Sequence, residues 1–104
     1  MNTPIGELQK LVVDWADSVF PDRTPEQAFR KLMEEEIEEM KKAPHDEMEF
    51  ADAVIVLLDL AHLMNIDISA AVKKKMEINK NRKWTLRDGL FKHVGEEEHE
   101  ISTR

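Results

Sequence analysis

Two pairs of acidic residues on either side of a short break constrain this sequence more than any other feature. Glu35 and Glu38 form the first pair, and Glu49 and Asp52 form the second. Each pair has a spacing of three residues, which on a helix puts both members on one face. Asp52 is also the first charged residue of a mostly apolar stretch, residues 50–64, where an unpaired carboxylate would be costly to bury. If two facing helices bring the pairs together, they form an oxygen-only site for a hard divalent cation.

The rest of the sequence predicts helices throughout. The segment Thr24-Pro25-Glu26-Gln27 is typical of a helix start, with Thr24 as the N-cap and Gln27 closing a capping box. Asp46 is expected to cap the next helix. No β pattern or repeat competes, so we predict an all-α fold, an antiparallel bundle of about four helices joined by short loops. The helices are expected over residues 4–19, 24–42, 47–64 and, starting from Asp67 or Ser69, to about residue 83.

The composition is that of one small domain. The chain has 104 residues, of which 41% are hydrophobic and 36% charged, and it has no cysteine. We expect a single helical domain over residues 1–94 and an acidic, flexible tail over residues 95–104. There is no signal-peptide pattern, and Asp52, Asp59 and His62 interrupt the longest apolar run, so no membrane association is expected. The lack of cysteine is typical of a reducing cytoplasm, which we take as the expected location.

Charge is distributed unevenly along the chain. The net charge of −7 argues against general nucleic-acid binding, which relies on a basic surface. Residues 31–52 carry a net charge of −6, whereas residues 70–93 carry +6. An acidic centre followed by a basic segment suits a metal site beside a phosphate site. It equally suits complementary helix faces within one bundle.

The acidic motif resembles that of a known superfamily. Glu34-Glu35-x-x-Glu38, followed after a ten-residue spacer by Glu49-x-x-Asp52, resembles the EExxE…ExxD signature of the all-α nucleoside triphosphate pyrophosphohydrolases. The segment 75–84 resembles the one that closes a small phage and bacterial MazG-like subgroup, and the whole resemblance covers about residues 31–94. The spacer is short for the family. A second register, Glu35-Glu36-x-x-Glu39, also fits the first half of the motif; Glu35/Glu38 is preferred because Lys31-Leu32 then precede the acids as in relatives.

This resemblance implies a metal-dependent hydrolase. Members use Mg²⁺ to hydrolyse a nucleoside triphosphate to the monophosphate and pyrophosphate, and Mn²⁺ is expected to substitute. By resemblance, one or two metal ions would be bound by Glu35, Glu38, Glu49 and Asp52. Glu34 is the candidate for orienting or deprotonating the attacking water, and one of the metal ligands is the alternative. A homodimer or homotetramer, acting in the cytoplasm of a bacterial or phage-infected cell, is the expected form.

The basic segment supplies candidates for substrate binding. Lys75, Asn79 and Arg82 share a helix face, and Lys and Arg suit phosphate oxygens. We hypothesise that these three residues hold the triphosphate or the pyrophosphate product, although a basic helix end is also favoured by the helix dipole. Trp84 would stack on a base or seal the end of the bundle.

Three further readings depend on the structure. Trp15 lies on an apolar stripe and is predicted to be part of the core. Asp59-x-x-His62 would either extend a metal site or make hydrogen bonds within the bundle or with a partner subunit. The competing functions are a non-enzymatic helical interaction protein and a ferritin-like di-iron bundle, for which the sequence offers only Glu96-x-x-His99.

Overall fold

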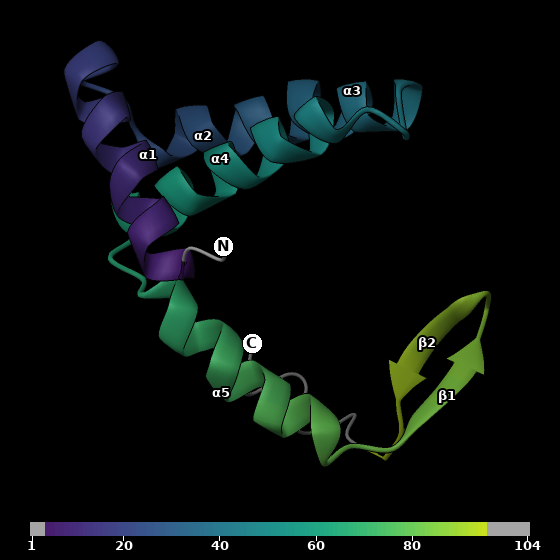
Figure 1. The fold of residues 1–104 in the computed structure, drawn as a ribbon. Coiled ribbons are helices and arrows are strands. Elements are labelled where there is room, and N and C mark those ends of the chain that lie inside the picture. The colour runs from purple at the N-terminus through teal and green to yellow at the C-terminus, as the bar shows by residue number, and fades with distance from the viewer. Residues whose placement is uncertain (1–3, 96–104) are drawn as a thin grey trace. The chain divides into compact units, whose positions relative to one another are not determined.

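The helical prediction is confirmed over most of the chain. The structure, a computed structural model, describes residues 4–95. The segments α2, η1 and α3 follow one another without a break, so the described residues contain four helices (Figure 1). The elements are α1 (Ile5–Val19), α2 (Pro25–Lys31), the π-helical turn η1 (Leu32–Glu36), α3 (Ile37–Lys42), α4 (Glu47–Leu63), α5 (Ile68–Lys80), β1 (Trp84–Arg87) and β2 (Leu90–His93).

Local side-chain hydrogen bonds set the helix starts as expected. The Thr24 hydroxyl accepts a hydrogen bond from the backbone N–H of Gln27, and the Gln27 side chain accepts one from the Thr24 N–H, which completes the capping box. Asp46 accepts from the N–H of Met48 at the start of α4. At the start of α5 it is Asp67, not Ser69, whose carboxylate accepts a backbone N–H.

The segment after α5 departs from the prediction that the chain has no β structure. The helix ends at Lys80, and residues 84–93 form an antiparallel hairpin in which Trp84 pairs with His93 and Arg87 with Leu90. Asp88 and Gly89 have φ values of 55° and 79°, the two positive angles that a type I′ turn requires. The Asp-Gly dipeptide was therefore a hairpin signal between two short strands.

Residue contacts divide the chain into two compact units, between Ala71 and Val72. The single domain over residues 1–94 stays a prediction from the sequence. In the first unit α4 contacts α1 and each segment of the α2–η1–α3 helix, and Figure 1 shows α2–α3 and α4 lying side by side. The second unit holds most of α5 and the hairpin. Of the predicted tail over residues 95–104, all but Gly95 lies outside the described residues.

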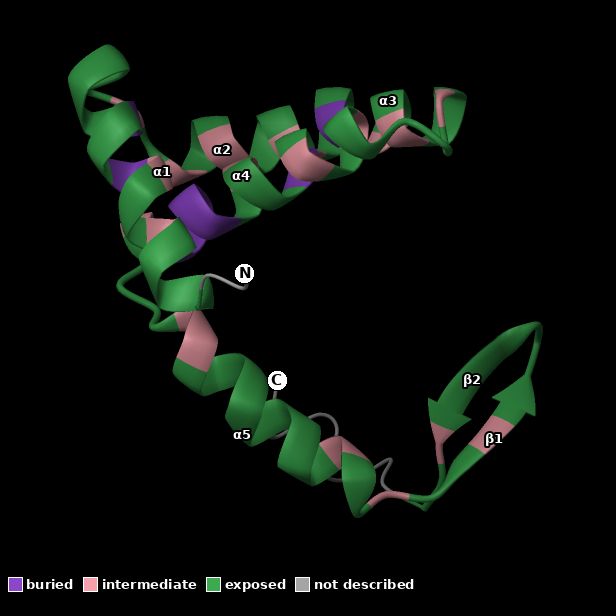
Figure 2. Cartoon of the chain, viewed as in Figure 1, coloured by how far each residue is buried: buried purple, intermediate pink, exposed green. Residues whose placement is uncertain are grey.

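The core of the described residues is small. None of their side chains falls below 2% exposure, and the buried apolar residues belong to α1 and α4 (Figure 2). Trp15, which was predicted to be part of the core, is 53% exposed. Several large apolar side chains of α4 are exposed to a similar degree. Between residues 4 and 95 no single helix is long and apolar enough to cross a membrane. Of these helices, only α4 and α5 taken together have the length and composition of a membrane span. The buried apolar residues are Val13, Ala16, Ala53, Leu58, Leu60 and Ala61.

Candidate active site

A widened helical turn determines which glutamate points toward α4. In η1 the backbone N–H of Ile37 bonds to the carbonyl of Leu32, five residues earlier, so this turn holds more residues than an α-helical turn. Residues four apart therefore stay on the inward face, and Leu32, Glu36 and Met40 are all buried or half-buried. Glu36 is only 4% exposed, whereas the apolar residues Phe29 and Met33 are 51% and 63% exposed.

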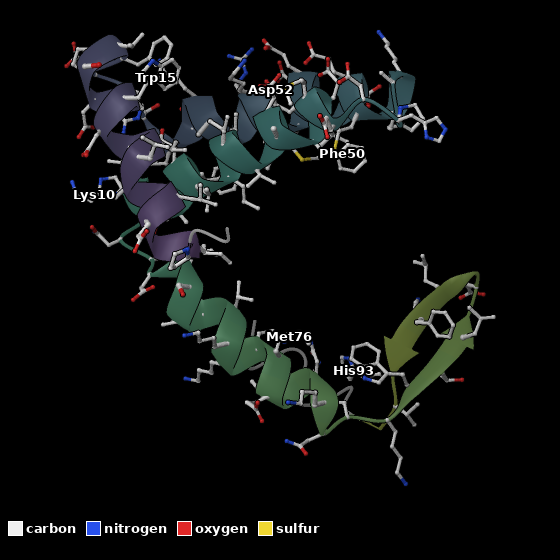
Figure 3. The ribbon with its side chains drawn as sticks, viewed as in Figure 1. Lys10, Trp15, Phe50, Asp52, Met76 and His93 are labelled. Carbon is white, nitrogen blue, oxygen red and sulfur yellow. The ribbon has the colours of Figure 1, made fainter. Side chains whose placement is uncertain are left out.

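Three carboxylates meet between η1 and α4. Glu36, Glu49 and Asp52 each offer an oxygen atom, and these atoms lie within 4.8 Å of one another. The short connection after α3 turns the chain so that the first turns of α4 lie beside η1, and Figure 3 marks Asp52 on α4. The predicted second pair, Glu49 and Asp52, is thus brought together with a glutamate from the preceding helix.

Two buried oxygen atoms of this cluster lack a hydrogen-bond donor. Glu36 Oε1 and Glu49 Oε1 are buried and have no hydrogen-bond partner. Desolvation raises the pKa of the Glu49 carboxyl, and the negative charges of Glu39, Asp46, Asp52 and Glu36 raise it further. An oxygen-only donor set with unpartnered buried carboxylate atoms fits a hard divalent ion such as Mg²⁺ or Mn²⁺.

The first predicted acid pair does not join this cluster. Glu35 and Glu38 are exposed and lie close to lysines, with Lys31 Nζ at 2.9 Å from Glu35 and Lys41 Nζ at 3.6 Å from Glu38. The difference has a physical reason, since the π-turn places Glu36 on the inward face. The second register that the sequence left open, Glu35-Glu36-x-x-Glu39, contains the buried Glu36, and the charge of its exposed Glu39 raises the pKa of Glu49.

Glu34, the candidate for handling the attacking water, is also exposed. Its two carboxylate oxygens accept hydrogen bonds from Arg30 at 3.1 and 3.3 Å, and this guanidinium holds the pKa of Glu34 below its usual value. A carboxylate held ionised by an arginine is a weak proton acceptor. Nothing in the described geometry connects Glu34 to the three-carboxylate cluster.

An open cavity of about 1100 Å³ adjoins the cluster. Glu36 and Asp52 line its acidic part, and Lys31 lies there as well. One part of its wall is aromatic, and there Trp15 and Phe20 contact each other edge to face with ring centroids 5.5 Å apart. The cavity thus joins an acidic site to a surface that suits a flat ring.

A buried ion pair that the sequence did not reveal supports the wall of this cavity. Arg23, in the α1–α2 connection, donates to both carboxylate oxygens of Asp59 on α4, at 2.6 and 2.7 Å. Asp17 lies 2.9 Å from the same guanidinium. Of the two roles left open for Asp59, the structure shows hydrogen bonding within the fold.

The residues predicted to bind phosphate lie in or beside the second unit's helix–hairpin junction. Lys75 is exposed on α5. The indole N–H of Trp84 donates to the backbone carbonyl of Asn79 at 3.0 Å, so Trp84 closes the end of α5. Arg82 lies 3.2 Å from His93 Nδ1, and the His93 ring meets Trp84 edge to face. His93, which the sequence did not single out, therefore holds Arg82 at this junction.

Comparison with known proteins identifies close relatives. Residues 8–98 match the family model described as dATP/dGTP pyrophosphohydrolase. A dATP/dGTP diphosphohydrolase of Salmonella phage PMBT28 is 49% identical over 92 residues, covering 86% of this chain and 31% of that protein. The chain therefore spans about a third of the length of this relative. A dATP/dGTP diphosphohydrolase of cyanophage S-2L is 37% identical over 97 residues, covering 90% of this chain and 91% of that protein.

One solved structure has the same fold. It is the cyanophage S-2L MazG-like pyrophosphohydrolase, bound to dGDP and three catalytic Mn²⁺ ions per active site. The TM-score is 0.81 at 36% sequence identity, and the match covers 90% of this chain and all of that one. The predicted MazG-like, all-α fold is confirmed for the four helices, and the short hairpin over residues 84–93 is an addition to it.

Proposed function

The chain belongs to the dATP/dGTP pyrophosphohydrolase family, and we propose that it hydrolyses purine deoxynucleoside triphosphates to the monophosphate and pyrophosphate with a divalent metal ion. The relatives named for dATP and dGTP, and the dGDP-bound neighbour, support this choice of substrates. Mg²⁺ is the expected metal, and the Mn²⁺ ions of the neighbour support Mn²⁺ as a substitute.

The observation that carries this proposal is the carboxylate cluster. Glu36, Glu49 and Asp52 offer converging oxygens, two of the buried carboxylate atoms have no partner, and Glu39 adds its charge nearby. We therefore assign the metal site to these four residues rather than to the Glu35/Glu38 register. Divalent ions at this site would neutralise triphosphate charge and lower the pKa of a bound water.

The cavity beside the cluster supplies a place for the nucleoside. With the phosphates at Glu36 and Asp52, the base would reach the Trp15–Phe20 wall, where an aromatic side chain can stack on it. The volume of about 1100 Å³ leaves room for a nucleotide and its metal ions. Lys75, Asn79 and Arg82 remain our candidates for the phosphates or the pyrophosphate product.

A homo-oligomer is part of the proposal. The apolar residues exposed on α4 include Phe50 at 49%, Val54 at 50% and Leu57 at 45%. Exposed apolar surface of this extent is typical of an interface, and a second copy of the chain is the partner we propose for it. Sedimentation velocity on the purified protein, compared with a Val54→Glu and Leu57→Glu variant, would show whether the assembly depends on this face.

The activity is tested by a panel of nucleotides. Purified protein is incubated with each common dNTP and NTP in Mg²⁺ or Mn²⁺, and pyrophosphate and phosphate are measured separately. We expect pyrophosphate and monophosphate in equal amounts, with dATP and dGTP turned over fastest. Release of phosphate alone would overturn the assigned cleavage position.

The register is tested by two neighbouring substitutions. Glu36→Gln should lose metal-dependent pyrophosphate release, whereas Glu35→Gln, which removes the same charge one residue earlier, should retain most of it. The reverse result would restore the Glu35/Glu38 assignment. Asp52→Asn should behave like Glu36→Gln, because both residues belong to the cluster.

The competing functions find less support. Among the described residues the only candidate metal cluster contains carboxylates and no histidine, and Glu96-x-x-His99 lies outside those residues. A di-iron bundle would need Glu-x-x-His on two helices. A non-enzymatic partner protein would show no thermal shift with Mn²⁺ and dGTP.

A further inference from the structure

Lys31 forms ion pairs with one exposed and one buried glutamate of η1. Its ammonium Nζ lies 2.9 Å from Glu35 Oε1 and 3.1 Å from Glu36 Oε2. The Glu35 side chain is 59% exposed, whereas the Glu36 side chain is 5% exposed. Among the ion pairs of the described residues, Lys31–Glu36 is the one in which a lysine or arginine contacts the carboxylate cluster.

From its position, the Lys31 ammonium can reach both the Glu36 carboxylate and the open space of the cavity. Lys31 lines the large cavity together with Glu36 and Asp52, and it also lines a small polar hollow with Arg30 and Glu34 on the outer side of the helix. Its side chain is 51% exposed, so the four-carbon stem can move without disturbing packing. A modest rotation would take the ammonium from the Glu36 carboxylate into the space where a triphosphate would lie.

Charge determines whether the ammonium stays at the Glu36 carboxylate or moves to the phosphates. Glu36 is buried beside Glu49 and Asp52, so a positive charge at its carboxylate relieves repulsion among three acids. A divalent ion bound by the same carboxylate would repel the ammonium and replace it. The ammonium would then be attracted to phosphate oxygens, which Lys binds as a compact point charge.

We propose that Lys31 and the divalent metal compete for the Glu36 carboxylate, and that the displaced Lys31 ammonium then binds a phosphate group of the substrate. The proposal rests on the function proposed above for this site. Lys31 would thus have two roles, since it balances charge at the metal site and then binds the triphosphate.

The first test measures metal binding without nucleotide. Mn²⁺ is titrated by calorimetry into metal-stripped wild-type protein and the Lys31→Met, Lys31→Arg and Lys41→Met variants. Lys31→Met should bind Mn²⁺ more tightly, by roughly three- to tenfold, which is the scale of one partly exposed ion pair. Lys31→Arg should stay near wild type. Lys41→Met removes the same charge from an exposed pair with Glu38 and should leave the affinity unchanged.

The second test measures catalysis. Lys31→Met should raise KM for dGTP by roughly tenfold, the effect of about 1.4 kcal/mol of lost phosphate binding, while kcat changes less. Lys31→Arg should recover most of the KM. Circular dichroism and thermal melts confirm folding, and Lys31→Gln serves as a second uncharged variant if Lys31→Met unfolds.

The outcomes separate this proposal from the proposed function. Equal or weaker Mn²⁺ affinity in both uncharged variants would overturn the competition, and an unchanged KM would overturn the phosphate contact. If the wild type binds Mn²⁺ but hydrolyses no nucleotide, the proposed function fails while the metal titration still decides the competition at Glu36.

Discussion

Arg23 and Asp59 form a buried ion pair with two hydrogen bonds, at 2.6 and 2.7 Å, between residues 36 apart in the sequence. Their side chains are 10% and 12% exposed. The pair attaches the α1–α2 connection to the C-terminal part of α4, and both residues line the cavity beside the carboxylate cluster. The carboxylate of Asp59 raises the pKa of Arg23 above its already high value, so the guanidinium of Arg23 keeps its positive charge.

Removing one member of this pair should destabilise the protein strongly. Arg23→Met leaves the Asp59 carboxylate buried without its partner, and we expect a loss of about 3–5 kcal/mol in the free energy of unfolding. Urea denaturation measures this loss. Asp17→Asn is the control, because Asp17 is 61% exposed and its removal should cost about 1 kcal/mol or less.

A double substitution separates the pair from the packing around it. Arg23→Met combined with Asp59→Leu removes both charges, and the double variant should be more stable than the sum of the single effects predicts. Additive losses would mean that the two side chains contribute independently.

The sequence predicted those features that depend on neighbouring residues. The Thr24–Gln27 capping box and the Asp46 cap were predictable because each acts within three residues. The second acid pair, Glu49 and Asp52, was predictable because it lies on one regular helix.

Features set by distant contacts or irregular backbone were not predictable in the same way. A 3.6-residue period cannot place Glu36 correctly across a π-turn, since the turn changes which residues share a face. Arg23 carried no local signal, because its partner lies on another helix. The hairpin did have a signal in Asp88-Gly89, but the strands beside it are only four residues long and mix charged with apolar residues.

The raised pKa of Glu49 predicts how stability depends on pH without metal. The folded protein binds more protons than the unfolded chain between the ordinary carboxyl pKa of 4.5 and the raised value of Glu49. The contribution of Glu49 to stability is therefore present at low pH and is lost as the pH rises through its raised pKa. In the presence of a chelator, Glu49→Gln should raise the melting temperature at neutral pH and have little effect below pH 4.5.

A neighbouring residue gives the control for this effect. Glu47 also lies in the first turn of α4, so Glu47→Gln removes a similar interaction with the helix dipole without touching the cluster. If Glu49→Gln raises the melting temperature at neutral pH no more than Glu47→Gln does, the repulsion assigned to Glu49 and its acidic neighbours would be contradicted. Saturating Mn²⁺ should stabilise the wild type and the Glu47 variant more than the Glu49 variant.

Trp15 should report on nucleotide binding. In a Trp84→Phe background it is the sole tryptophan, and stacking of a purine in the cavity should quench its fluorescence when dGDP and Mg²⁺ are added. Trp15→Ala should raise KM for dGTP at least roughly fivefold, because base–aromatic stacking contributes about 1–3 kcal/mol. Mn²⁺ affinity without nucleotide should not change. An unchanged KM together with unquenched fluorescence would place the base elsewhere.

Arg82 is held by His93, and this contact predicts a graded effect on substrate binding. If the guanidinium binds phosphate, Arg82→Ala should raise KM for dGTP sharply, since a charge-assisted contact is lost. His93→Leu keeps the charge but removes the ring that orients it, so its KM should lie between that of Arg82→Ala and the wild type. Lys83→Ala removes an adjacent positive charge and serves as the control. Equal effects of Arg82→Ala and Lys83→Ala would reduce the role of this segment to its net charge.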